Sequence, residues 1–120
     1  MARELVVKVT CGTDAPERAN QGFTVAATAA ASGARVSLWL TGEGAWLAVP
    51  DRAAELALPL ATPISDLLAS ILELGTVTVC SQCAARREIG ESDVLPGVRI
   101  AGAPVFVEEA LREGTQALIY

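Results

Sequence analysis

Two cysteines lie three residues apart in Cys80-Ser81-Gln82-Cys83, directly after an apolar β-branched run, Thr76-Val77-Thr78-Val79. The run predicts a strand, and we expect a short helix over Ala84 to Ile89. A thiol where a strand passes into a helix meets backbone N–H groups that favour the thiolate, the form that attacks sulfur. The position therefore suits persulfide or disulfide chemistry. The competing interpretation is that both cysteines are small buried hydrophobic residues.

Other chemistries of a cysteine pair have less support in this sequence. A zinc site usually takes about four Cys or His ligands, and the chain has three cysteines and no histidine. Haem attachment needs His after the second cysteine, where this chain has Ala84. We therefore predict no metal and no other cofactor. A dithiol redox pair stays open, although such pairs normally lie in an early strand–helix unit.

Two further segments follow predicted strands and belong to the same rim of a parallel sheet, where ligands bind. They are Cys11-Gly12-Thr13, after a strand over Glu4 to Thr10, and Thr41-Gly42-Glu43-Gly44, after a strand over Arg35 to Leu40. The candidate substrate-binding residues on this rim are Thr13, Asp14, Gly42, Gly44, Ser81 and Gln82. The alternatives are that the glycines serve only the turns, that Thr13 and Asp14 only cap a helix, and that Cys11 is a core thiol.

The elements between these segments alternate between helix and strand. Asp14 and Glu17 resemble a capping box around Pro16, and Gly33 ends the helix that follows. Its apolar stripe is Ala19, Phe23, Ala26, Ala27 and Ala30. A second helix begins at Ser65, and its apolar face is Leu67, Leu68, Ile71, Leu72 and Leu74.

The remaining segments complete an alternating pattern. We predict an irregular excursion over 45–62, with an exposed loop around Trp46, and then a strand over 98–101, a helix over 105–113 and a strand over 116–120. Trp39 and Trp46 are expected to anchor the core or an interface. Alternating strands and helices indicate a mostly parallel sheet, and residues 1–120 are predicted to form a single α/β domain.

The charge and the composition limit the kinds of partner that we expect for this chain. The formal charge is −5 and the pI is near 4.6, which disfavours nucleic acid because phosphate binding depends on clustered Lys and Arg. We find neither a signal-peptide pattern nor an apolar run near the ~20 residues that span a bilayer. A cytoplasmic location, away from membranes and with reduced thiols, is the expectation.

The order of the segments resembles the DsrE/DsrF-like family, which includes sulfur-relay proteins. The matching segments are Gly12-Thr13-Asp14-Ala15-Pro16-Glu17-Arg18, Val36-Ser37-Leu38-Trp39-Leu40-Thr41-Gly42-Glu43-Gly44, Ile64-Ser65-Asp66-Leu67-Leu68, Val77-Thr78-Val79-Cys80-Ser81-Gln82-Cys83-Ala84 and the terminal strand. This resemblance implies a three-layer α/β/α sandwich with a five-stranded parallel sheet, assembled as a homo-oligomeric trimer or hexamer.

The resemblance also implies roles for the two cysteines. The cysteine that resembles Cys80 carries sulfane sulfur as a persulfide, and many members have a second cysteine like Cys83, followed by an Arg-Gly pair. Here that pair is Arg87-Glu88, a departure that places a negative charge nearby.

The sequence therefore leaves three candidate functions open. The first is a sulfur-relay protein, a possible sulfurtransferase, that exchanges sulfur with donor and acceptor proteins through Cys80. The second is a dithiol oxidoreductase that uses Cys80 and Cys83 as a redox pair. The third is a non-catalytic assembly or ligand-binding module of the same fold.

Overall fold

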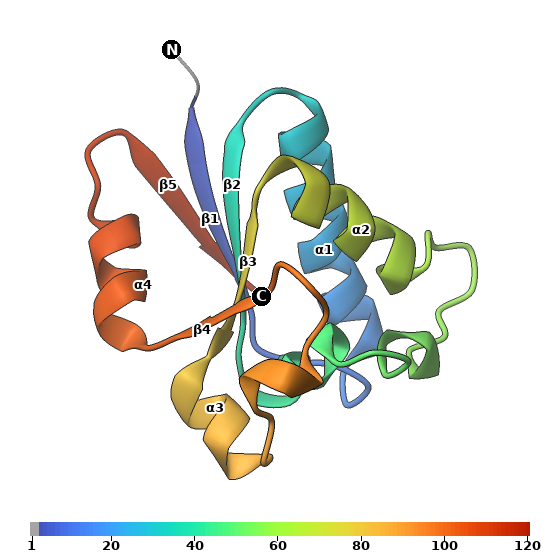
Figure 1. Ribbon diagram of the computed structural model, residues 1–120. Coiled ribbons are helices and arrows are strands. Elements are labelled where there is room, and N and C mark those ends of the chain that lie inside the picture. The colour runs from blue at the N-terminus through green and yellow to red at the C-terminus, as the bar shows by residue number, and fades with distance from the viewer. Residues whose placement is uncertain (1–2) are drawn as a thin grey trace.

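The computed structural model describes residues 3–120, which form one parallel sheet with helices on both of its faces (Figure 1). The strands are β1 (Glu4–Val9), β2 (Arg35–Leu40), β3 (Thr76–Cys80), β4 (Arg99–Ala101) and β5 (Thr115–Ile119). The α-helices are α1 (Pro16–Ala31), α2 (Ile64–Leu74), α3 (Ser81–Arg86) and α4 (Ala103–Ala110). Three short 3₁₀ helices are η1 (Gly42–Ala48), η2 (Ala53–Glu55) and η3 (Glu91–Asp93).

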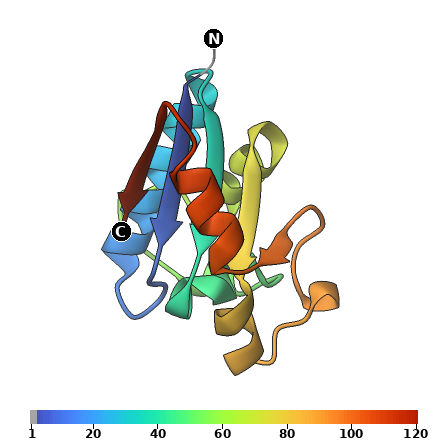
Figure 2. The same ribbon diagram turned by 90° about the vertical axis from the view of Figure 1, so that its left-hand side faces the viewer.

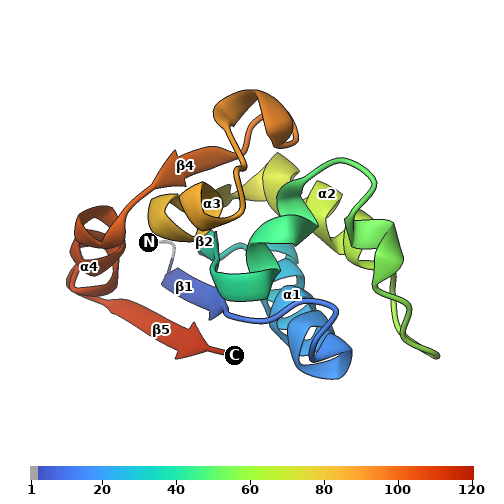
Figure 3. The same cartoon turned by 90° about the horizontal axis from the view of Figure 1, so that it is seen from below.

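The sheet order is β4-β3-β2-β1-β5, and each neighbouring pair is parallel. Helices α1 and α2 cover one face, and α4 covers the other while it carries the chain from β4 at one edge to β5 at the opposite edge (Figures 1 and 3). The predicted three-layer α/β/α sandwich with five strands is confirmed, and the sheet is entirely parallel. All carboxyl ends of the strands therefore meet at one edge.

The face under α1 and α2 is aliphatic, because valine and leucine side chains of β1, β2 and β3 are buried in one cluster with the mostly small residues of α1. All five residues of the stripe predicted for the first helix are buried: Ala19, Phe23, Ala26, Ala27 and Ala30. Gly22 allows the close approach of α1 to β1, since a Cβ there would lie 2.5 Å from Cγ2 of Val9. Small residues thus set the spacing between helix and sheet.

The face under α4 is polar. Lys8, Trp39, Thr78 and Arg99 are register partners across β1, β2, β3 and β4, so they form one row on this face. Phe106 of α4 packs edge-on against Trp39 with ring centroids 5.3 Å apart, and Nζ of Lys8 lies 4.6 Å from the centroid of the Phe106 ring. Figure 2 shows α4 lying across this face.

Two packing expectations for the helical layer are wrong. The loop around Trp46 is not exposed, because Ala45, Leu47 and Ala48 of η1 are buried and the guanidinium of Arg52 covers the Trp46 ring at 4.1 Å. In the second helix, Leu68 and Ile71 are buried, but Leu74 is 55% exposed. As the last residue of α2, Leu74 lines an open cavity beside the sheet instead of the core.

The irregular stretch after β2 agrees with the prediction, since residues 45–62 hold only the end of η1 and the three-residue η2. Among residues 3–120, the structure has no helix whose length and hydropathy would allow it to cross a bilayer.

Candidate functional site at the carboxyl edge of the sheet

Cys80 is the last residue of β3 and immediately precedes α3. It has an extended backbone, with φ −60° and ψ 127°, and its side chain is half-buried. The helix that follows was predicted over Ala84 to Ile89, but it begins at Ser81 and ends at Arg86. Because α3 starts without a connecting loop, Ser81, Gln82 and Cys83 all lie in its first turn, and α3 projects from the carboxyl edge of the sheet (Figures 1 and 3).

The surroundings of Cys80 favour its anionic form. Burial raises the pKa of the Cys80 thiol, but hydrogen bonding from the backbone N–H and the thiol of Cys83 and from the backbone N–H of Gln82 lowers it. The positive charge of Lys8 acts in the same direction, and the net result is a pKa below the ordinary value of a cysteine. As the N-cap residue of α3, Cys80 makes no side-chain capping hydrogen bond. Hydrogen-bond donors that lower the pKa of a thiol stabilise its thiolate more than the neutral form.

Cys83 is held by the loop that follows β2. The backbone N–H of Gly42 donates to Sγ of Cys83 at 3.2 Å. Arg87 donates from Nη1 to the carbonyl oxygen of Cys83 at 3.1 Å and pairs through Nη2 with the carboxylate of Glu43 at 2.9 Å. Gly42 and Glu43 thus connect the end of β2 to α3. Of the predicted rim residues, Gly42 contacts Cys83 through its backbone N–H.

Gly44 has a packing role in the same loop. It is buried, and a Cβ there would lie 2.8 Å from the carbonyl oxygen of Val9 and 3.0 Å from that of Cys11. Gly12 has a similar contact, since a Cβ there would lie 2.7 Å from the carbonyl oxygen of Glu43. The loops after β1 and β2 therefore pack backbone against backbone. That packing holds the ends of β1 and β2 together on the rim.

The predicted capping box at the start of α1 is wrong. Ala15 occupies the N-cap position without a side-chain hydrogen bond, and α1 begins at Pro16. Asp14 instead accepts a hydrogen bond from the backbone N–H of Gly12 at 2.8 Å, so its carboxylate closes the loop before the helix. Thr13 and Asp14 are both exposed. They lie on the loop after β1, whereas Ser81 and Gln82 lie directly beside Cys80.

Cys11 differs from Cys80 in its environment. It is 3% exposed, and burial together with the negative charge of Asp14 raises the pKa of its thiol, which Arg18 offsets only in part. This agrees with the interpretation of Cys11 as a core thiol at a strand end. All three cysteines are free thiols.

Sequence reasoning missed Lys8 and Gly102 as neighbours of the site. Lys8 was visible as the one charged interruption of the apolar run that follows Glu4, and its charge acts on Cys80 from the face under α4. At Gly102, which caps α4, a Cβ would lie 3.1 Å from Oγ of Ser81. No local motif marks this approach, because it depends on how β4 pairs with β3. Within residues 3–120, no three His, Cys, Asp or Glu side chains gather closely enough to hold a metal ion.

Comparisons with known proteins cover nearly the whole chain. The model of the DsrE/DsrF-like family matches residues 4–117. The uncharacterized protein MJ0760 of Methanocaldococcus jannaschii is 32% identical over 105 residues. That match covers 87% of this chain, which spans only 38% of the length of this relative.

Two solved structures have the same fold. The YchN protein of E. coli has a TM-score of 0.81 and 15% identity, with 100% of each chain covered. MTH1491, a protein of unknown function from Methanobacterium thermoautotrophicum, has a TM-score of 0.73 and 12% identity, with coverage of 98% of this chain and 99% of the other. At these identities the likeness concerns the fold alone.

Proposed function

The chain belongs to the DsrE/DsrF-like family, and on that premise we propose that it relays sulfur, with Cys80 carrying sulfane sulfur as a persulfide. The observation that carries the proposal is the environment of Cys80. Its half-buried sulfur lies at a strand end, with the backbone N–H groups of Gln82 and Cys83 and the charge of Lys8 all favouring the anion. The thiolate is the nucleophile in sulfur exchange.

The proposed step needs no external oxidant or reductant. The Cys80 thiolate attacks the outer sulfur of a donor persulfide, R–S–SH. A new S–S bond forms on Cys80, the donor S–S bond breaks, and R–S⁻ leaves with the electron pair. The proton of the outer sulfur stays on it or passes to water, and the same hydrogen-bond donors can stabilise the resulting Cys80–S–S⁻. Discharge is the same exchange, with an acceptor thiolate attacking the outer sulfur.

Cys83 is proposed as an auxiliary thiol. Hydrogen bonding from its thiol lowers the pKa of Cys80, so Cys83 can assist the anion or attack the inner sulfur of the persulfide. That attack would form a Cys80–Cys83 disulfide and release HS⁻, which balances atoms and electrons. The effect of Cys83 on the pKa of Cys80 also supports the second candidate function, a dithiol oxidoreductase that passes two electrons and two protons to a disulfide partner.

We propose donor and acceptor proteins as partners, and a homo-oligomer, trimer or hexamer, as the working assembly. Support for the assembly comes from exposed apolar side chains on the outer helix and on the edge strand. These are Val107 and Leu111 of the α4 segment and Leu118 and Ile119 of β5. Light scattering tests the assembly, and a monomer at micromolar concentration would contradict it.

Cyanolysis after loading tests the proposed function. Protein incubated with glutathione persulfide and then freed of the donor should release thiocyanate with cyanide, in a ratio of one per chain. Cys80→Ser should release none, whereas Cys11→Ser should match the original chain. Equal release from Cys80→Ser, with circular dichroism showing a folded protein, would contradict the proposal.

The oxidoreductase alternative predicts a different pattern. The Cys80–Cys83 disulfide would form with a measurable midpoint potential, and Cys83→Ser would lose all activity toward disulfide substrates. Under the sulfur-relay proposal, Cys83→Ser still loads sulfur on Cys80. An unmodified Cys80 under both treatments would favour the non-catalytic module.

A further inference from the structure

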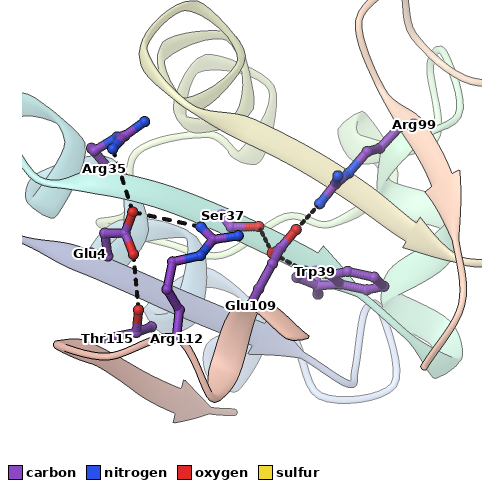
Figure 4. A network of polar contacts seen from close by, with 8 residues as sticks. All are labelled: Glu4, Arg35, Ser37, Trp39, Arg99, Glu109, Arg112 and Thr115. Carbon is purple, nitrogen blue, oxygen red and sulfur yellow. Dashed lines mark hydrogen bonds and ion pairs between the residues drawn. The ribbon is translucent and has the colours of Figure 1, made fainter. Parts of the chain in front are cut away.

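A second polar site lies at the edge of the sheet opposite Cys80, where β1, β2 and β3 begin. A cavity of about 500 Å³ opens there between the strand ends and the segment that follows α4. Its lining includes the guanidinium groups of Arg35, Arg99 and Arg112 and the carboxylates of Glu4 and Glu109. Figure 4 shows these side chains in two groups, with Arg35 and Arg112 around Glu4 and Arg99 against Glu109.

One wall of this cavity is fixed by Glu109. Its carboxylate accepts hydrogen bonds from Oγ of Ser37 at 2.6 Å and from Nε1 of Trp39 at 3.0 Å, and it pairs with Arg99 (Figure 4). Arg99 also donates from Nε to Oγ1 of Thr78. Both oxygens of the Glu109 carboxylate therefore have partners, and its charge is neutralised by Arg99. This half of the network holds the wall in place and leaves no excess charge.

In the other half of the network, around Glu4, positive charge exceeds negative charge. Glu4 accepts a hydrogen bond from Thr115 at 3.0 Å, and two guanidinium groups share its other oxygen at 3.5 Å (Arg35) and 3.6 Å (Arg112). Both distances exceed those of a direct charge-assisted hydrogen bond. The side chains of Arg35 and Arg112 are 75% and 52% exposed, so most of their N–H donors are open to solvent.

The charge of the cavity and its lining indicate which class of ligand it can bind. Three guanidinium groups against two carboxylates leave a local excess of positive charge in a chain whose net charge is −5. Guanidinium forks match the paired oxygens of carboxylate and phosphate groups. The rest of the lining is uncharged and includes apolar side chains such as Ala30, Ala34 and Leu74. A compact oxyanion with a short carbon body meets both parts of the cavity.

We propose that this cavity binds a small carboxylate or phosphate between Arg35 and Arg112, at a site separate from Cys80. The ligand oxygens would accept from both forks, while Glu4 keeps the two guanidinium groups turned inward. The Glu109–Arg99 pair supports the wall without contacting the ligand. The site does not depend on sulfur transfer, since Cys80 lies at the opposite edge of the sheet.

Titration with two simple anions tests this site. Inorganic phosphate and succinate are titrated separately into the full chain, with ¹⁵N-resolved NMR spectra following Nε–Hε of Arg35 and Arg112 and the backbone of Ser37 and Thr76. At least one anion should give saturable shifts confined to these groups, and the anion that binds identifies the ligand class. Added NaCl should weaken the binding by screening.

Substitutions of the two arginines test whether they are the residues that bind the anion. Arg35→Gln and Arg112→Gln should each weaken binding by about tenfold, since each removes a charge-assisted hydrogen bond. The matched control is Arg86→Gln on the exposed surface of α3, outside the cavity. Arg86→Gln and Cys80→Ser should both bind as the original chain does. The proposal is overturned if neither anion saturates, or if both cavity variants bind like the control while remaining folded.

Discussion

The backbone N–H of Gly42 donates to Sγ of Cys83 at 3.2 Å, across 41 positions of sequence. This bond connects the loop after β2 to the first turn of α3, three residues after Cys80. Gly42 has φ +54°, and a Cβ there would lie 2.6 Å from the carbonyl oxygen of Thr10. The geometry of the cysteine pair therefore depends on a glycine in a neighbouring loop.

Gly42→Ala should destabilise the protein by about 2 to 4 kcal/mol, because it adds a backbone overlap to the cost of a left-handed residue. The control is Gly33→Ala, whose φ is +97° with nothing within 4 Å of the added Cβ. It should cost only the conformational part, about 1 to 2 kcal/mol. Urea unfolding measures both losses, and equal losses would contradict the role given to the Thr10 contact.

Alkylation should separate the cysteines by pH. The pKa of the Cys80 thiol lies below its usual range and that of Cys11 lies above it, so at neutral pH more of Cys80 is thiolate. Iodoacetamide should modify Cys80 at a lower pH than Cys11, as read by peptide mass spectrometry of quenched samples. Modification of Cys11 at the same or a lower pH would contradict the assignment.

Lys8→Met should raise the pKa of Cys80 and slow its alkylation at neutral pH, because a positive charge that favours the thiolate is removed. Lys8→Arg keeps the charge and should react nearly as the original chain does. The shift should appear in the pH profile of Cys80 and leave that of Cys11 unchanged. A pH profile for Cys80 that is the same in Lys8→Met and in Lys8→Arg would remove Lys8 from the site.

Glu109→Gln should lower the free energy of unfolding at neutral pH by about 1 to 3 kcal/mol, because Arg99, Ser37 and Trp39 lose a charged acceptor. Burial raises the pKa of the Glu109 carboxyl, but hydrogen bonds from Ser37, Trp39 and Arg99 and the charge of Arg99 lower it by more. The stabilisation is therefore complete above the pKa of an unfolded Glu, roughly 4.3. It is lost as the pH falls through the lower folded value.

Chemical denaturation at several pH values measures this contribution. The difference between Glu109→Gln and the original chain should shrink as the solution is acidified. Glu108→Gln, an exposed neighbour on α4, should leave stability nearly unchanged at every pH. A constant difference for Glu109→Gln would indicate that the carboxylate charge is not what holds α4 to the sheet.

Hydrophobic periodicity was sufficient to predict the main helices and strands and the residues that are buried against one face of the sheet. The stripe that contains Phe23 is buried as predicted, because apolar residues at helical spacing lie on the one side of a helix that faces the core. Helix boundaries were less predictable. The expected cap at Asp14 failed because its carboxylate bonds to Gly12 within the preceding loop, and local sequence does not distinguish the two uses of an aspartate.

The sequence located Cys80 and Cys83 but not most of their partners. Lys8 and Gly102 reach the site through strand pairing, which depends on sheet order. Gly42 was predicted as a ligand-binding candidate, and the structure adds its backbone bond to Cys83. The polar face under α4 was also missed, because Ser37 and Thr78 sit within strands that are otherwise mostly apolar.

The most direct test of the persulfide account is peptide mapping by mass spectrometry after loading with glutathione persulfide and blocking of remaining thiols. The account predicts one added sulfur atom on the peptide that contains Cys80, in the original chain and in Cys83→Ser. Sulfur found on Cys11 or Cys83 with Cys80 unmodified, or on no cysteine of a folded protein, would contradict it.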